Sequence, residues 1–133
     1  MPKVSKDSVS AKDYGPVAEW GEEVEGYRVS FVTYKVPDLD NTPLLKGLPD
    51  DQCQCPHWGY VLKGSWTLRY GSEKQETYEA GDAFYFPPGH IPIGNAPGTE
   101  VVMFSPAGEL DKTEQVIMRN MEAMQAQQSG AGA

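Results

Sequence analysis

The side chains of this chain that bind metals best gather at two places in the sequence. Its two cysteines and two histidines are Cys53, Cys55, His57 and His90. The first three lie just before one glycine-bounded, β-like run, and His90 follows the next such run directly after PPG. Thiolate and imidazole are strong ligands for transition metals near neutral pH. The pattern therefore predicts one metal site formed by two neighbouring turns.

The local spacing also sets a requirement on the backbone. Cys53, Cys55 and His57 are at alternate positions, so an extended segment would turn all three to one face. A straight strand would nevertheless separate Cys53 from His57 by roughly 13 Å, whereas metal bonds are only about 2.0 to 2.3 Å long. We therefore expect the chain to turn between them, and Pro56 is well placed for this.

The identity of the ligands indicates the metal and what it could do. Two thiolates and two imidazoles favour zinc, with ferrous iron or copper as weaker fits. Four protein ligands would make a structural site, whereas an open position would permit Lewis-acid catalysis. If only one cysteine binds, catalysis is the better interpretation. The alternative is that both cysteines fill the core, that His57 is a hydrogen-bonded core residue and that His90 faces solvent.

Aromatic residues surround the predicted metal site in the sequence. An aromatic core explains most of them, and they could also line a pocket. Tyr60 and Tyr85 are candidate catalytic residues, because a tyrosine hydroxyl can donate a proton or orient a substrate. Asp51 is better explained as a loop cap than as a ligand. We find no serine–histidine–acid set, phosphate-binding loop or pair of catalytic carboxylates.

Length and charge limit the class of protein. With 133 residues and 39% hydrophobic content, the chain suits one domain with a modest core. A net charge of -8 argues against nucleic acid and anionic membranes as partners. The start lacks the apolar core of a secretory signal, and no run of apolar residues is long enough to span a membrane. We expect a cytoplasmic protein whose cysteines are reduced or bound to metal.

Short β-like runs separated by glycine and proline corners predict an all-β fold, a small antiparallel barrel or jelly roll. Helical spacing of apolar residues after Pro106 predicts one C-terminal helix, over about 108–127, packed on the outside of the barrel. Residues 1–16 are expected to be flexible, 17–127 to form the single domain and 128–133 to be a disordered tail. The expected strands are Tyr27–Val36, Trp58–Leu62, Ser65–Tyr70, Glu76–Glu79, Ala83–Phe86 and Glu100–Phe104, with 37–51 expected to be a loop containing at most a short strand.

Two of these segments resemble the motifs of the cupin superfamily. They read H-W-G-Y-V-L-K-G, ending at Gly64, and G-D-A-F-Y-F-P-P-G-H, beginning at Gly81. The glycine and proline skeleton, including Pro87 and Gly89, has the family spacing, and the resemblance covers about residues 50–105. It implies a small single-domain cupin barrel of the conserved cupin 2 type, with atypical motif residues.

The ligands depart from the family pattern. Counting back from Gly64 places His57 where the family has its glutamate, and it places Asp51 and Cys53 at the two histidine positions. In the second motif Pro92 occupies the histidine position, with His90 two residues earlier. The usual site of three histidines and one glutamate therefore cannot be carried over.

The resemblance implies dioxygenases, isomerases, cyclases and lyases without choosing among them. One hypothesis is a metal-dependent enzyme for a small organic substrate. The other is a binding or sensor protein that holds a small molecule, with a structural metal or none. The resemblance also implies a homodimer, for which Tyr27–Val36, apolar on both faces, is the candidate inter-subunit strand.

Overall fold

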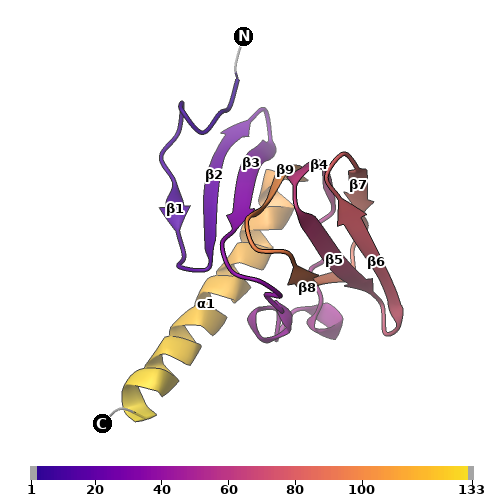
Figure 1. Ribbon diagram of the computed structural model, residues 1–133. Helices are drawn as coiled ribbons and strands as arrows, with labels where there is room; N and C mark the ends of the chain where they lie inside the picture. The colour runs from indigo at the N-terminus through magenta and orange to yellow at the C-terminus, as the bar shows by residue number, and fades with distance from the viewer. Residues whose placement is uncertain (1–2, 132–133) are drawn as a thin grey trace.

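The computed structural model describes residues 3–131. Two antiparallel sheets face each other, and a long helix follows the last strand (Figure 1). The elements are β1 (Lys12–Asp13), β2 (Val17–Val24), β3 (Tyr27–Tyr34), η1 (Thr42–Leu44), η2 (Pro49–Asp51), β4 (His57–Lys63), β5 (Ser65–Tyr70), β6 (Lys74–Glu79), β7 (Ala83–Phe86), β8 (His90–Asn95), β9 (Thr99–Pro106) and α1 (Ala107–Ala131).

The sheet order confirms the predicted fold class. The larger sheet has the order β1-β2-β3-β9-β4-β7, the smaller sheet has the order β6-β5-β8, and neighbouring strands are antiparallel. This is a jelly roll with one C-terminal helix, as the sequence predicts. The two sheets do not close into a barrel, so the space between them stays open on one side.

Alternation along the strands builds the core between the sheets. On β5, Trp66 and Leu68 are buried, and on β7, Phe84 and Phe86 are buried. The rings of Phe84 and Phe86 stack with their centroids 4.2 Å apart, and Trp66 meets Phe86 edge-on at 5.1 Å. Aromatic pairs of this kind stabilise a core beyond the area that they bury. These aromatic contacts pack the inner face of the larger sheet against the inner face of the smaller sheet.

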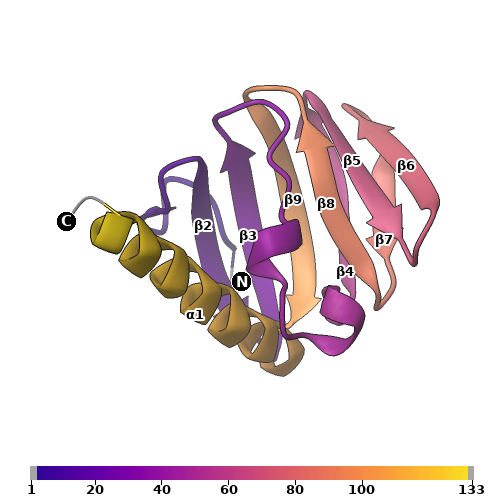
Figure 2. The same cartoon turned by 90° about the horizontal axis from the view of Figure 1, so that it is seen from below.

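The helix does more than cover the outside. Its Leu110 and Ile117 pack against a second core cluster that contains Leu45, Cys55 and Ile91. Figure 2 shows α1 crossing beside β2 and β3, with η1 between the helix and the small sheet. The sequence predicted a helix packed on the outside of the barrel. That prediction is only partly correct, because one side of α1 faces the space between the sheets. No helix in residues 3–131 is long and apolar enough to cross a membrane.

The chain ends differ in detail from the expected boundaries. The helix continues to Ala131, beyond the expected end at 127, and positions 132–133 of the predicted tail lie outside the described residues. Within the segment predicted to be flexible, β1 pairs with β2, and Lys6 forms an ion pair with Glu100 at 2.9 Å. Residues 1–2 lie outside the described residues.

Candidate metal centre

Three of the four predicted metal ligands come together between the sheets. Cys53, His57 and His90 each offer one ligand atom, and these atoms lie within 4.8 Å of one another. The Cys53 Sγ atom is 3.7 Å from His57 Nε2. A tetrahedral ion with ordinary metal–sulfur and metal–nitrogen bonds would hold these two atoms about 3.6 Å apart. This pair of atoms therefore has the spacing that a shared metal ion requires.

Backbone pairing brings the three residues together. Cys53 forms an isolated bridge with His90, in which the Cys53 N–H donates to the His90 carbonyl at 2.9 Å. The Gly89 N–H donates back to the Cys53 carbonyl at 2.8 Å. His57 begins β4 after a bend at Cys55, so the chain does turn between Cys53 and His57. The predicted turn, which is needed if Cys53 and His57 are to bind one metal ion, is therefore present.

A hydrogen bond at Nδ1 fixes the orientation of each imidazole. His90 Nδ1 donates to the Pro87 carbonyl at 2.8 Å, since a carbonyl oxygen can only accept. His57 Nδ1 lies 2.6 Å from Ser105 Oγ, which accepts in the matching tautomer. Each ring then presents an unprotonated Nε2. Partners of this kind are the usual way in which a protein fixes a histidine ligand.

Burial sets the protonation state of the group. It lowers the pKa of His57 to about 3, with the nearby His90 as a second cause, and it also lowers the pKa of His90. Both imidazoles are therefore neutral at pH 7, the form that binds metal. Burial raises the pKa of the Cys53 thiol, although its hydrogen bonds with the Cys55 backbone and the Thr113 side chain oppose this shift. A metal would have to displace the thiol proton.

The structure does not bring the fourth predicted ligand into this group. The Cys55 thiol donates to the Pro56 carbonyl at 3.4 Å and lies 4.0 Å from the Pro106 carbonyl. Burial raises its pKa to about 12, with the charge of Cys53 as the next cause. Asp51 is also outside the group, and its carboxylate accepts a hydrogen bond from Gly47 N–H at 2.9 Å as a loop cap.

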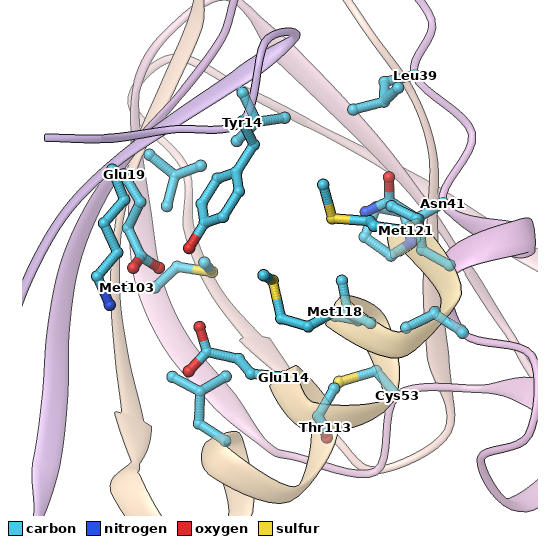
Figure 3. Close-up of a pocket in the computed structure, with 18 of the residues that line it drawn as sticks. Tyr14, Glu19, Leu39, Asn41, Cys53, Met103, Thr113, Glu114, Met118 and Met121 are labelled. Carbon is cyan, nitrogen blue, oxygen red and sulfur yellow. The ribbon is translucent and has the colours of Figure 1, made fainter. Parts of the chain in front are cut away.

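The metal-ligand group opens into a cavity of about 800 Å³. Its walls come from the inner faces of both sheets, from the 37–45 loop and from α1. Figure 3 shows Cys53 and Thr113 at one side of this space and side chains of α1 reaching across it. A volume of this size suits a small organic molecule. A metal ion held by Cys53, His57 and His90 would therefore be accessible to a molecule in the cavity.

The two predicted catalytic tyrosines lie elsewhere. Tyr60 is 42% exposed and Tyr85 is 48% exposed, on the face of the large sheet that points away from the cavity, and neither lines the cavity. Tyr85 packs there against Trp58, with ring centroids 5.1 Å apart. The structure therefore separates Tyr60 and Tyr85 from the metal-ligand group.

A different tyrosine lines the cavity. Tyr34 is 5% exposed, and within residues 3–131 we find no hydrogen bond from its hydroxyl. Burial raises its pKa, and the charges of Glu19 and Cys53 add to the effect, so the hydroxyl stays protonated at neutral pH. The sequence does not single out Tyr34, because Tyr27–Val36 is apolar on both faces and its pattern does not indicate which face points inward.

Comparison with known proteins identifies the fold. No protein-family model matches the chain, and no match is found among curated proteins. KdgF from a Halomonas species superposes with a TM-score of 0.55 at 16% identity, over 79% of this chain and 94% of KdgF. The polyketide cyclase RemF from Streptomyces resistomycificus superposes with a TM-score of 0.54 at 17% identity, over 80% of each chain. The chain has the cupin fold.

A third cupin-fold structure contains a metal. HEPD from Streptomyces albus, with 2-hydroxyethylphosphonate and Fe(II) bound, superposes with a TM-score of 0.53 at 21% identity. The match covers 74% of this chain but 24% of HEPD. At these identities the three likenesses establish the cupin fold alone, and the function must be argued from the residues of the site.

Proposed function

We propose that this cupin is a metal-dependent enzyme that acts on a small organic substrate held in the cavity. The observation that carries the proposal is the group of Cys53, His57 and His90, whose ligand atoms lie within 4.8 Å of one another in the cavity wall. Three protein ligands and an open position are typical of catalytic metal sites, whereas structural zinc sites have four. The separation of Cys55 from the group favours the catalytic alternative.

The donor chemistry favours zinc as the metal. One thiolate and two imidazoles form a soft to intermediate ligand set, which suits zinc best and ferrous iron or copper less well. When bound, the ion would act as a Lewis acid, polarising a substrate oxygen or activating water. His57 and His90 would hold it through Nε2, with Ser105 and the Pro87 carbonyl keeping the rings in place.

Other residues of the cavity would position the substrate. The Tyr34 hydroxyl is protonated and lines the cavity without a protein partner among residues 3–131, so it can donate a hydrogen bond to a substrate oxygen. Trp66 also lines the cavity and offers an aromatic wall. The helix contributes residues such as Met118 to the cavity wall, which offer apolar surface to the carbon skeleton of a substrate.

The first test is the metal content of protein purified without an affinity tag or chelator. We expect close to one ion per chain by mass spectrometry, lost in His57→Ala and His90→Ala, and retained in the control variant Cys55→Ser. A screen of small oxygenated compounds with the metal-loaded protein would then find turnover that His57→Ala abolishes. Turnover retained by a metal-free His57→Ala protein would contradict the enzyme proposal.

A second candidate function is a binding or sensor protein without chemistry. It is favoured by the departure of this chain from the usual cupin ligand set. Under this alternative, His57→Ala would leave the affinity for a cavity ligand unchanged. The same variant therefore separates the two functions.

We also propose that this cupin forms a homodimer through the outward face of its large sheet. Val29, Phe104, Trp58 and Tyr85 lie side by side in one row across β3, β9, β4 and β7. Trp58, Tyr85 and Phe104 are each more than two fifths exposed. The strand β3 lies between β2 and β9, so it would contribute outward side chains and not a free backbone edge.

A further inference from the structure

The cavity has a second polar wall, distinct from the metal-ligand group. Figure 3 shows the hydroxyl of Tyr14 and the carboxylates of Glu19 and Glu114 turned toward one another, with Cys53 in another part of the same cavity. Glu19 comes from β2 and Glu114 from α1, so the two carboxylates belong to walls that are far apart in the sequence. This wall contains two acidic side chains that the proposed metal chemistry does not use.

The cations near this wall do not neutralise it. Arg28 is the nearest, and its guanidinium is shared among Glu114 at 3.1 Å, Asp111 at 3.3 Å and Glu19 at 3.5 Å. With three carboxylates around it, Arg28 has little capacity left for an anionic ligand. The other charged residues of the cavity wall are Lys12, Arg119 and Glu122, so carboxylates outnumber cations by four to three.

Burial makes this imbalance costly. The side chains of Glu19 and Glu114 are 14% and 29% exposed. Burial raises the pKa of Glu19, the charge of Glu114 raises it further, and the charges of Arg28 and Lys12 only partly oppose both. A carboxylate removed from water without full pairing is stabilised when a cation approaches it. A positively charged group entering the cavity would supply that pairing.

Tyr34 adds a further polar group to the cavity wall. Tyr34 is 5% exposed, lines the cavity, and has no hydrogen-bond partner found within residues 3–131. Burial raises the pKa of this hydroxyl, and the charges of Glu19 and Cys53 raise it further. Its oxygen is accessible from the cavity, so it can exchange a water molecule for a polar group of a ligand. A ligand that extends between the metal-ligand group and the acidic wall would pass this hydroxyl.

The remaining wall suits an organic cation. Met103 and Met118 lie beside the acidic pair, together with the ring of Tyr14 (Figure 3). Thioether and aromatic surfaces pack against a carbon skeleton, and an aromatic ring also attracts a nearby cation. A hydrated metal ion would gain nothing from these apolar surfaces. The wall therefore combines charge for a cationic head with apolar surface for the carbon atoms attached to it.

We propose that Tyr14, Glu19 and Glu114 form a subsite for a positively charged organic group, such as a protonated amine, on the substrate of this cupin. The inference rests on the proposed function, because it assigns the non-reacting end of the same substrate. The reacting end would lie at Cys53, His57 and His90, and Tyr34 would contact the part between them.

The test compares three probes that share a carbon skeleton. These are 3-phenylpropylamine, 3-phenylpropanol and 3-phenylpropanesulfonate, titrated by calorimetry into the zinc-loaded protein at pH 7. We expect the amine to bind about tenfold more tightly than the alcohol, the size of one charge-assisted hydrogen bond, and the sulfonate not to bind. Equal affinity for amine and alcohol, or tighter binding of the sulfonate, would overturn the proposal.

Substitutions test whether the preference for the amine depends on Glu19 and Glu114. Glu19→Gln combined with Glu114→Gln should bring the affinity for the amine down to that for the alcohol and leave the alcohol unchanged. Glu22→Gln is the matched control, because Glu22 is exposed on the same strand. If the double variant does not fold, Glu114→Gln alone, which leaves the pair between Arg28 and Glu19, must still weaken amine binding about threefold.

The same samples separate this inference from the proposed function. Metal content is measured on each of them. An ion bound at one per chain with no preference for the amine would refute the subsite alone. A preference for the amine in a protein that takes up no metal would refute the metal-dependent enzyme, and it would leave a cavity that selects cations.

Discussion

At the scale of single residues, protonation couples Cys53 to its two histidine neighbours. Because burial keeps His57 and His90 neutral and keeps the Cys53 thiol protonated, the three residues reach pH 7 with only one proton to lose on metal binding. Cys55, with a pKa raised to about 12, stays a thiol. The number of protons released on metal binding therefore depends on which cysteine binds the metal.

Zinc binding at pH 7 should release about one proton per ion. Calorimetry in buffers with different heats of ionisation measures this number directly. Cys55→Ser should leave the release unchanged, whereas Cys53→Ser should remove it together with most of the affinity. Release of two protons would mean that Cys55 also binds, and the site would then be closer to a structural one.

The metal-free protein should lose stability as the pH falls. The imidazole of His57 takes up a proton at a pH of about 6.5 in the unfolded chain, but only at about 3 in the folded chain. Between these values the unfolded state binds more protons, so stability falls with pH. We expect a loss of about 2 kcal/mol from this residue between pH 7.5 and pH 5.

Urea unfolding at the two pH values measures this loss. The matched variant is His57→Asn, which cannot titrate and should show a pH dependence smaller by the same amount. An unchanged pH dependence in His57→Asn would mean that this imidazole is not held neutral by burial.

The candidate site could be predicted in part from residue types alone. Cysteine and histidine are strong ligands wherever they lie, so their clustering in the sequence predicted the group of Cys53, His57 and His90, which the structure brings together. Which cysteine belongs to it depends on a bend at Cys55, and spacing does not specify that bend. Tyr34 and Glu19 could not be found, because their role depends on which face of a strand meets the cavity.

At the scale of elements, the corner between β4 and β5 depends on a glycine. Gly64 has a φ of +81°, and a Cβ atom there would lie 2.3 Å from Thr99 Oγ1. Thr99 is fully buried, and its hydroxyl lies 2.7 Å from the Ala96 carbonyl and 2.9 Å from the Ser65 carbonyl, which share its one proton. The corner and the start of β9 are therefore packed directly against each other.

Replacement of this glycine should be strongly destabilising. Gly64→Ala combines a left-handed backbone with a clash against Thr99, and we expect a loss of about 3 kcal/mol in the free energy of unfolding. Gly71→Ala is the control, because Gly71 has a φ of +60° but nothing within 4 Å of its added Cβ. It should lose only about 1 kcal/mol, measured by urea unfolding. Equal losses in the two variants would exclude the clash.

Strands were predicted where residue types alternate clearly and missed where they do not. Ser65–Tyr70 and Ala83–Phe86 match β5 and β7 at both ends. The strand β2 was not predicted, because its glycine and three glutamates obscure the pattern. The strand β8 contains Pro92 and Gly94, which favour a loop in isolation, and its pairing with β5 shifts register beside Pro92. Tertiary pairing overrides local preference in both strands.

At the scale of the whole molecule, the apolar surface is divided between two faces of the large sheet. The inner face builds the core and the cavity, and the outer face leaves Trp58, Tyr60, Tyr85 and Phe104 each more than two fifths exposed. Exposed aromatic residues in one contiguous area are typical of an interface. The position of Tyr60 and Tyr85 on this face explains why they are far from the chemistry that sequence analysis assigned to them.

The proposed homodimer should therefore depend on the centre of this outer row. Sedimentation equilibrium at micromolar concentration should show a dimer for the wild type. Trp58→Lys would place a charge between Phe104 and Tyr85, its neighbours in the row, and should raise the dimer dissociation constant about thirtyfold or more. Thr77→Lys, on an exposed position of the smaller sheet, is the control and should remain dimeric. A wild-type monomer at micromolar concentration would contradict the dimer, and the exposed aromatic face would then need another partner to cover it.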